Sequence, residues 1–212
     1  MKVLLLGDSI RMFYQKEVIS QLGEDYQVYG PDENCRFSLY MLNSIRFWMN
    51  QFPIPDIIHF NAGLWDTAIL YKEDGCFVGI DDYVKNMKRI YRELKKTGAK
   101  IIFATTTPVS DDKISFCGPM PPAHDNEKII QYNNAVLQAY KNEDIIINDL
   151  FSAMYPKRKT LLRDDMIHPN EEGAKLLGGL VANAIKSCGD YKNRNTATRV
   201  LVKDKQDEKT IQ

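Results

Sequence analysis

The segment MKVLLLGDSIRMFY, residues 1–14, decides the fold. The apolar run from Val3 to Leu6 predicts a buried strand, and it passes through Gly7 and Asp8 directly to Ser9. Residues 11–22 then have the pattern of a helix. A strand that turns at once into a helix is typical of a parallel sheet, whose ligands bind beyond the carboxyl ends of the strands. Ser9 is therefore expected at the ligand-binding edge of the sheet.

The rest of the chain repeats this alternation of strands and helices. The strands are apolar runs without polar alternation, which is the pattern of a parallel sheet covered on both faces. They are predicted at residues 3–6, 27–29, 57–60, 100–105 and 145–148, with helices at 11–22, 38–50, 81–97, 126–141 and after Pro169 and Asn170. The sequence thus predicts an α/β fold with a five-stranded parallel sheet.

The length of 212 residues suits a single domain followed by a tail. We expect the domain at residues 1–188 and a polar, mobile tail at 189–212. Two longer loops, at 67–80 and 108–125, interrupt the regular pattern. Long loops in a compact domain are often functional.

The balance of charge argues against several classes of protein. Lys and Arg number 28, as do Asp and Glu, so the formal net charge is zero, and neither a nucleic-acid partner nor a membrane surface is expected. No apolar run is long enough for a signal-peptide core or a membrane span. The four cysteines are scattered without a Cys-x-x-Cys pair, which argues against a zinc site. Free thiols in a reducing cytoplasm are the favoured interpretation, with two disulfides as the alternative.

Three short stretches carry candidate chemistry, and the first is the strand tip that ends at Ser9. Near a helix N-terminus a backbone N–H points outward and the local field favours an anion. Ser9 could therefore be a nucleophile whose own N–H stabilises an oxyanion. A serine in this place also commonly caps its helix, and the tripeptide alone favours capping.

The second stretch, DDMIHPN at 164–170, offers a base and an acid. A serine nucleophile requires a base, and the base requires an orienting acid. Asp165 and His168 are three residues apart, close enough to meet across one turn of chain. Of the other histidines, His59 lies in an apolar strand and His124 has no acidic partner at that spacing. An ordinary turn before a helix is the alternative interpretation.

The third stretch, NAGLWD at 61–66, follows the strand predicted at 57–60 and is another strand tip. The carboxyl ends of parallel strands meet at one edge of a sheet, so this turn should lie beside the first. The alternative is a plain strand-to-loop turn in which Trp65 is a core aromatic residue.

Taken in order, these stretches resemble the SGNH (GDSL-type) hydrolase family. The resemblance extends from residue 1 to about residue 187 and rests on GDSI at 7–10, ATTTPV at 104–109, the run from YNNAVLQAY to INDLF, and DMIHPNEEG at 165–173. It implies a three-layer, flavodoxin-like sandwich and a serine esterase or acyl hydrolase that needs no metal and no cofactor. It further implies Ser9 as the nucleophile, His168 as the base and Asp165 as the acid that orients the base.

The oxyanion hole is where the chain departs from the family's pattern. The backbone N–H of Ser9 is one expected donor. Where the family offers a glycine N–H, this chain has PDENCRFS at 31–38, and Arg36 lies nearest the expected place. Trp65 holds the position of the family's asparagine, and its indole N–H is a donor. Asn61 is the alternative side-chain donor.

We therefore expect a cytoplasmic serine esterase that cleaves a small acyl ester through an acyl-enzyme intermediate. Deacetylation of an acetylated carbohydrate or a similar small molecule is the favoured reaction, with Trp48, Trp65 and Tyr71 as candidate stacking surfaces. A lysophospholipase or thioesterase is the alternative within the family. A catalytically silent ligand-binding module, or a metal-dependent phosphatase or receiver-like domain that uses Asp8, is the alternative from another class. The sequence leaves the oligomeric state open.

Overall fold

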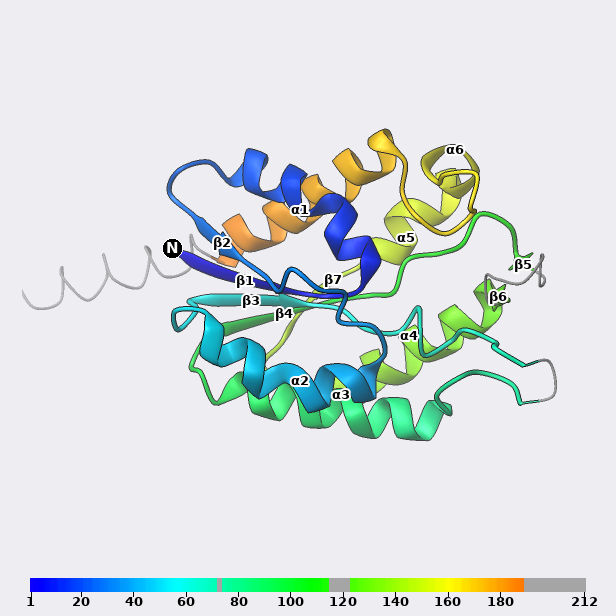
Figure 1. The fold of residues 1–212 in the computed structure, drawn as a ribbon, viewed down its shortest axis with the longest axis horizontal. Helices are drawn as coiled ribbons and strands as arrows, with labels where there is room; N and C mark the ends of the chain where they lie inside the picture. Colours follow the sequence, from blue (N-terminus) through cyan, green and yellow to red (C-terminus); the bar gives the residue numbers. More distant parts are fainter. Residues whose placement is uncertain (72–73, 115–122, 189–212) are drawn as a thin grey trace, which may run out of the picture.

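The computed structural model describes residues 1–71, 74–114 and 123–188, so the tail predicted at 189–212 lies outside the described residues. Its central sheet has five parallel strands in the order β2-β1-β3-β4-β7 (Figure 1). The strands are β1 Lys2–Leu6, β2 Gln27–Tyr29, β3 Ile57–Phe60, β4 Lys100–Ala104 and β7 Ile146–Asn148. This order is flavodoxin-like. The predicted sheet is confirmed, and each strand end lies within one residue of its prediction.

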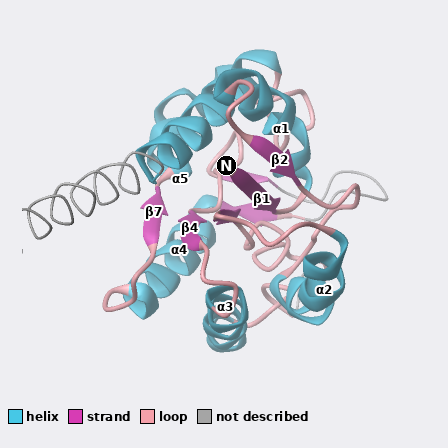
Figure 2. Ribbon diagram, turned by 90° about the vertical axis from the view of Figure 1, so that its left-hand side faces the viewer, coloured by secondary structure: helices cyan, strands magenta, loops and turns pink. Residues whose placement is uncertain are grey.

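Helices cover both faces of the sheet and make it the middle of three layers (Figures 1 and 2). On one face lie α1 Ser9–Leu22, α5 Leu150–Met154, α6 Arg158–Leu161 and a helix that includes residues 171–188. On the other lie α2 Ser38–Gln51, α3 Ile80–Lys95 and α4 Asn126–Tyr140. Within the described ranges, every helix is too short or too polar to cross a membrane.

Each interior strand packs against both layers of helices. On β1, Val3 and Leu5 join the core beneath α1, whereas Leu4 and Leu6 join the core beneath α2 and α3. All four side chains are at most 1% exposed. Because successive side chains of a strand point to opposite faces, a strand covered on both faces must be apolar throughout. This explains the uninterrupted apolar run at the start of the chain.

In helix α3 the buried residues recur with the period of a helix, because only one side of the helix faces the sheet. Its buried positions include Tyr83, Met87, Ile90 and Leu94, whose spacing of three and four residues places them on one face of the helix. The chain leaves the helix through Gly98, whose φ of 76° is a left-handed conformation that suits glycine.

Four short elements, two helices and two strands, were not predicted. Helices α5 and α6 have 5 and 4 residues, too few for an apolar period to stand out. The strands β5 Lys113–Ile114 and β6 His124–Asp125 pair antiparallel inside the segment expected to be a loop at 108–125. A two-residue strand exists only because its partner lies beside it, so its own sequence carries little signal.

Candidate active site

Ser9 and His168 meet at the carboxyl edge of the sheet, although 159 residues separate them. The distance from Ser9 Oγ to His168 Nε2 is 2.8 Å, and the distance from His168 Nδ1 to Asp165 Oδ2 is 3.0 Å. When the ring proton is on Nδ1, the Nδ1–H group donates a hydrogen bond to Asp165, and Nε2 accepts a hydrogen bond from the hydroxyl group of Ser9. The structure thus brings the three residues predicted from the sequence into one series of hydrogen bonds.

The turn from β1 into α1 places the Ser9 hydroxyl. Helix α1 begins at Ser9, and its cap is Asp8, whose Oδ1 accepts the Ile10 N–H at 2.9 Å. The interpretation of Ser9 as the helix cap is therefore wrong. Asp8 caps the helix, and the Ser9 hydroxyl forms its hydrogen bond with His168. The N–H groups of the first helical turn have no acceptor within the helix, so the Ser9 N–H is oriented outward.

A tight loop holds Asp165 and His168 in fixed relation. Asp165 Oδ1 accepts the backbone N–H groups of Ile167 at 3.0 Å and His168 at 2.8 Å, while Oδ2 faces the imidazole. Met166 has a φ of 65°, and its carbonyl accepts the Ser110 N–H at 2.9 Å, which ties the loop to the segment after β4. Acid and base are therefore positioned by one local turn.

The hydrogen bonds to Asp165 also decide its charge. Partial burial raises the pKa of this carboxyl, but the N–H groups of His168 and Ile167 and the imidazole lower it, and the net pKa lies below the ordinary value. Asp165 is therefore a carboxylate at neutral pH and accepts a charge-assisted hydrogen bond from the Nδ1–H group of His168.

Phe13 covers one face of the His168 ring. The two ring centroids are 4.9 Å apart at an interplanar angle of 29°, and the Arg163 guanidinium lies 5.4 Å from the centroid of the Phe13 ring. Sequence reasoning missed Phe13. The signal was present, because a residue four positions after Ser9 lies on the same side of a helix.

Two buried carboxyl groups lie behind this edge. Asp8 is fully buried, and its Oδ2 has no hydrogen-bond partner among the described residues. Asp66 accepts the Ser38 N–H on both carboxyl oxygens at 3.0 Å, which fixes the N-terminus of α2 to the turn after β3. Burial raises the pKa of each carboxyl to about 6, although the hydrogen bonds from Ser38 and Ile10 act in the opposite direction.

The burial of Asp8 bears on the phosphatase or receiver-like alternative. Such a domain needs an acidic oxygen open to a metal and to the substrate. Asp8 is 0% exposed and serves as a helix cap, so it offers no such oxygen.

The turn around Arg36 lies against the strand tip. The Cys35 N–H donates to the Gly7 carbonyl at 3.1 Å, and Arg36 has a left-handed φ of 52°. The Arg36 guanidinium lies over the Tyr40 ring, 4.8 Å from its centroid, so the side chain is turned aside. The Arg36 N–H donates to Asn34 Oδ1 at 2.8 Å, so Asn34 would have to release it before it could reach an oxyanion.

The two side-chain donors differ in how free they are. Asn61 is buried, and its Nδ2 donates to the Ala104 carbonyl at 2.8 Å. Trp65 is 40% exposed, so the interpretation of Trp65 as a core residue is wrong. Within the described part of the chain its indole N–H makes no hydrogen bond. Trp65 thus has the freer donor, and Asn61 the better fixed one.

The predicted stacking role of Trp48 is also wrong. Trp48 is fully buried, and its indole N–H donates to Glu33 Oε1 at 2.7 Å. Tyr71, by contrast, is 68% exposed on the loop after β3.

The family model described as GDSL-like lipase/acylhydrolase matches residues 46–176, a range that includes Asp165 and His168 and begins after Ser9. A catalytic mutant of Axe2, an acetylxylan esterase from Geobacillus stearothermophilus, has a TM-score of 0.69 at 20% identity, over 87% of this chain and 93% of that one. A GDSL-like lipase from Bacteroides thetaiotaomicron has a TM-score of 0.69 at 19% identity, over 88% of each chain. TesA has a TM-score of 0.64 at 16% identity, over 88% of this chain and 99% of that one. Among curated proteins, no sequence matches this chain.

The buried Asp8 predicts a stability that depends on pH. Its folded-state pKa of about 6 exceeds the ordinary 3.8, so its contribution to folding is fully present below about pH 3.8 and is lost as the pH rises to about 6. A gap of about two pKa units corresponds to about 3 kcal/mol. Asp8→Asn keeps an acceptor for the Ile10 N–H and cannot ionise. The unfolding free energy of Asp8→Asn minus that of the native chain should therefore increase by up to about 3 kcal/mol when the pH is raised from about 4 to 7.

Urea unfolding at the two pH values measures this difference. Asp164→Asn is the control, because Asp164 is exposed and its loss should leave the pH dependence unchanged. Equal pH dependence in the Asp8→Asn variant and the native chain would contradict the prediction.

Proposed function

The chain belongs to the GDSL-like lipase/acylhydrolase family and is an ester-hydrolysing enzyme, and we propose that Ser9 is its nucleophile in the hydrolysis of a small acyl ester. The observation that carries the proposal is the series of hydrogen bonds from Ser9 through His168 to Asp165. The favoured substrate is an acetylated carbohydrate or a similar small molecule. Axe2, which shares the fold, is an acetylxylan esterase, and the exposed rings of Trp65 and Tyr71 follow β3 at the same edge of the sheet.

In the first half of the reaction Ser9 Oγ attacks the acyl carbon. His168 Nε2 takes the hydroxyl proton as the new C–O bond forms, and the carbonyl oxygen becomes an oxyanion. The ester C–O bond then breaks, and the same proton passes from Nε2 to the departing alcohol. The acyl group remains on Ser9.

In the second half, water replaces the alcohol. His168 Nε2 accepts a proton from the water as its oxygen attacks the acyl carbon, and returns that proton to Ser9 Oγ as the acid leaves. Throughout, Asp165 holds the proton on Nδ1, which keeps Nε2 available and stabilises the imidazolium. Phe13, stacked on the ring, limits the rotation of His168 away from Ser9.

In this scheme the backbone N–H of Ser9 donates the first hydrogen bond to the oxyanion. Trp65 Nε1–H is the proposed side-chain donor, with Asn61 as its competitor, and Arg36 N–H is the proposed second backbone donor. Preorganised donors of this kind supply a large part of the rate enhancement in acyl transfer.

We also propose a cytoplasmic location. Cys35, Cys76 and Cys188 are free thiols, and Cys117 lies outside the described residues. Thiols persist in a reducing compartment.

The test of the function is a series of p-nitrophenyl esters of increasing acyl length, measured with the native chain and with Ser9→Ala. We expect the acetate to be cleaved fastest, chelator to leave the rate unchanged, and Ser9→Ala to lose about 10⁴-fold or more in kcat. A fluorophosphonate should label Ser9. Undiminished hydrolysis by Ser9→Ala would refute the assignment of the nucleophile. A preference for long acyl chains or for thioesters would instead indicate a lysophospholipase or a thioesterase.

Replacing the orienting acid should cripple turnover without unfolding the protein. In serine triads, asparagine in place of the acid costs on the order of 10⁴ in kcat because the imidazole is held in the wrong tautomer. We expect a loss of about that size for Asp165→Asn. Asp164→Asn is the matched control, since Asp164 is the adjacent exposed carboxylate, and its kcat should change by less than about twofold. The reverse order of sensitivity would mean that Asp164 is the acid.

Two variants distinguish the oxyanion donors. Trp65→Phe keeps most of the aromatic area and deletes the N–H, so loss of a donor should lower kcat by about 10²- to 10³-fold. Loss of a stacking surface would instead raise KM with kcat little changed. Asn61→Ala is measured beside it. If Trp65→Phe keeps a near-normal kcat and Asn61→Ala loses most of its kcat, Asn61 is the side-chain donor to the oxyanion.

A further inference from the structure

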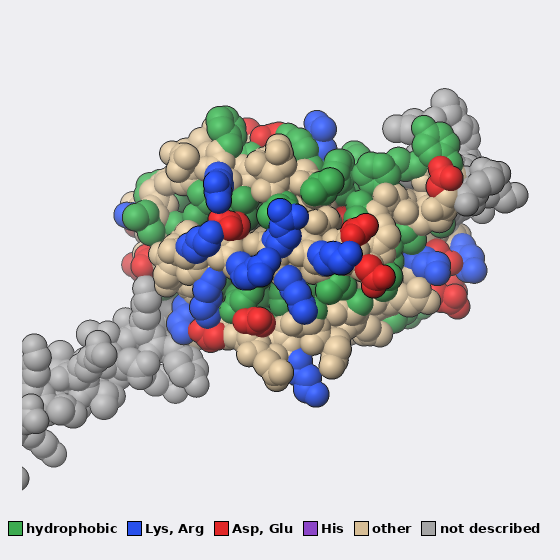
Figure 3. Space-filling view, turned by 90° about the horizontal axis from the view of Figure 1, so that it is seen from below, with side chains coloured by type: hydrophobic (Ala, Val, Ile, Leu, Met, Phe, Trp, Pro, Cys, Tyr) green, Lys and Arg blue, Asp and Glu red, His purple; other side chains and the backbone are tan. Residues whose placement is uncertain are grey.

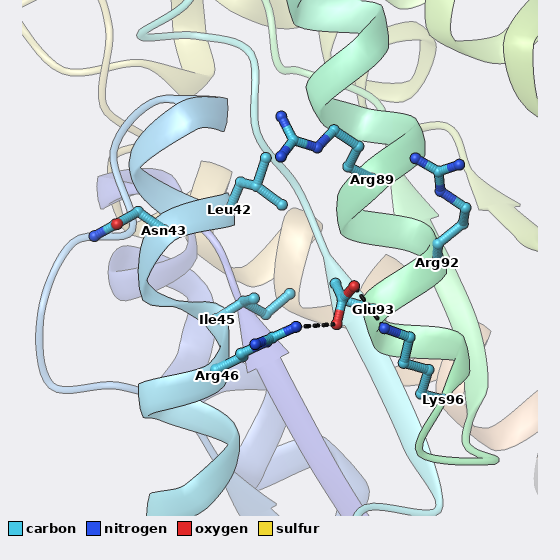
Figure 4. A pocket seen from close by; sticks show the side chains of 8 residues that line it. All are labelled: Leu42, Asn43, Ile45, Arg46, Arg89, Arg92, Glu93 and Lys96. Carbon is cyan, nitrogen blue, oxygen red and sulfur yellow. Dashed lines mark hydrogen bonds and ion pairs between the residues drawn. The ribbon is translucent and has the colours of Figure 1, made fainter.

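A groove runs between α2 and α3 on the face of the sheet opposite α1 (Figure 4). Its volume is about 550 Å³, within the range of about 300–1,000 Å³ typical of small-molecule sites. The middle of α2 and the C-terminal half of α3 line it, with side chains of Leu42, Asn43, Ile45, Arg46, Arg89, Arg92, Glu93 and Lys96. None of these residues belongs to the active site described above.

The lining is strongly basic in a chain of zero net charge. Arg46, Arg89, Arg92 and Lys96 face a single carboxylate, Glu93, so the groove carries a net charge of +3. Lys and Arg side chains gather across the middle of this face of the molecule (Figure 3). This surface therefore attracts anions more strongly than the net charge of the chain suggests.

Glu93 engages two of the cations and leaves two open. Its Oε1 lies 2.7 Å from Lys96 Nζ, and its Oε2 lies 3.7 Å from an Arg46 guanidinium nitrogen, so the carboxylate links α3 to α2. Arg89 and Arg92 form no hydrogen bond or ion pair with any described residue. Both are exposed, and in Figure 4 the Arg89 guanidinium extends from α3 toward Leu42, whereas that of Arg92 extends on the side of α3 away from Leu42.

Stabilisation of the helix accounts for only part of this arrangement. Cations in the last turn of a helix interact favourably with its dipole, which explains Arg92 near the end of α3. Arg89 lies further from that end, and Arg46 belongs to a different helix. Beneath the cations lie the half-buried Leu42 and the buried Ile45, so the groove has an apolar floor and a charged rim.

We propose that this groove binds a small ligand that bears two or more phosphate groups. Guanidinium groups bind phosphate through two parallel hydrogen bonds, and three of the four cations here are arginines. A single phosphate carries about −1.5 to −2 at pH 7 and leaves part of the +3 charge unneutralised, whereas a linked pair or triplet of phosphates can balance all of it. The apolar floor suits a ligand with an uncharged portion, such as a nucleoside, so both inorganic polyphosphate and a nucleoside polyphosphate have the required chemistry.

Calorimetric titration with orthophosphate, tripolyphosphate and ATP at low salt tests the proposal. Tripolyphosphate should bind at least about tenfold more tightly than orthophosphate, because several cations act on one ligand. Tighter binding of ATP than of tripolyphosphate would identify a nucleotide as the source of the phosphates, and equal binding would identify inorganic polyphosphate.

Variants on one helix separate a site from a general attraction by charge. Arg89→Gln/Arg92→Gln should weaken tripolyphosphate binding at least about tenfold. Lys85→Gln/Lys88→Gln removes the same charge from α3 outside the groove and should weaken binding by about twofold or less. Glu93→Gln removes the competing carboxylate and should strengthen binding several-fold. Equal losses in the two double variants, or no binding of tripolyphosphate by the native chain, would overturn the proposal.

The outcome is independent of the proposed catalytic function. The two groove variants and the Lys85→Gln/Lys88→Gln control should all keep the native rate of ester hydrolysis, which also shows that they are folded. The groove proposal fails or stands on the titrations alone.

Discussion

The hydrogen bond between Ser9 and His168 is the contact on which the rest of the site depends. It joins residues 159 positions apart, so neither local segment can form it alone. One side is fixed because β1 lies inside the sheet, between β2 and β3, and turns directly into α1. The other is fixed because Asp165 accepts two backbone N–H groups from its own loop. The two segments therefore meet only in the folded chain.

Local signals explain why much of this arrangement could be predicted. The apolar run of β1 and the three-residue spacing of Asp165 and His168 are written in short stretches of sequence. The contacts that were missed join distant stretches. Asp66 supplies the acceptor at the start of α2 across 28 residues, and Glu33 receives the indole N–H of Trp48 across 15. The α2–α3 groove likewise exists only because two helices pack side by side, which no single helical pattern reveals.

The same edge of the sheet concentrates groups that weaken the fold. Asp8 and Asp66 are buried carboxyls, and burial penalises their charged forms at neutral pH. The turn after β3 adds a steric constraint, because a Cβ at Gly63, whose φ is 150°, would overlap Thr106 Oγ1. Natural proteins accept such local conflicts mainly where function requires them. The two apolar cores, one on each face of the sheet, offset the conflicts at its edge.

The position of β1 in both the sheet and the chain has a consequence for biosynthesis. Ribosomes add roughly 5–20 residues per second, so Ser9 is made about 8 to 30 seconds before His168. During that interval the nascent chain carries the serine of the site without its partner imidazole. Strand β1 also cannot pair on both sides until β3 has been translated. Translation of the 163–168 loop is therefore the event that gives the Ser9 hydroxyl its hydrogen-bond acceptor.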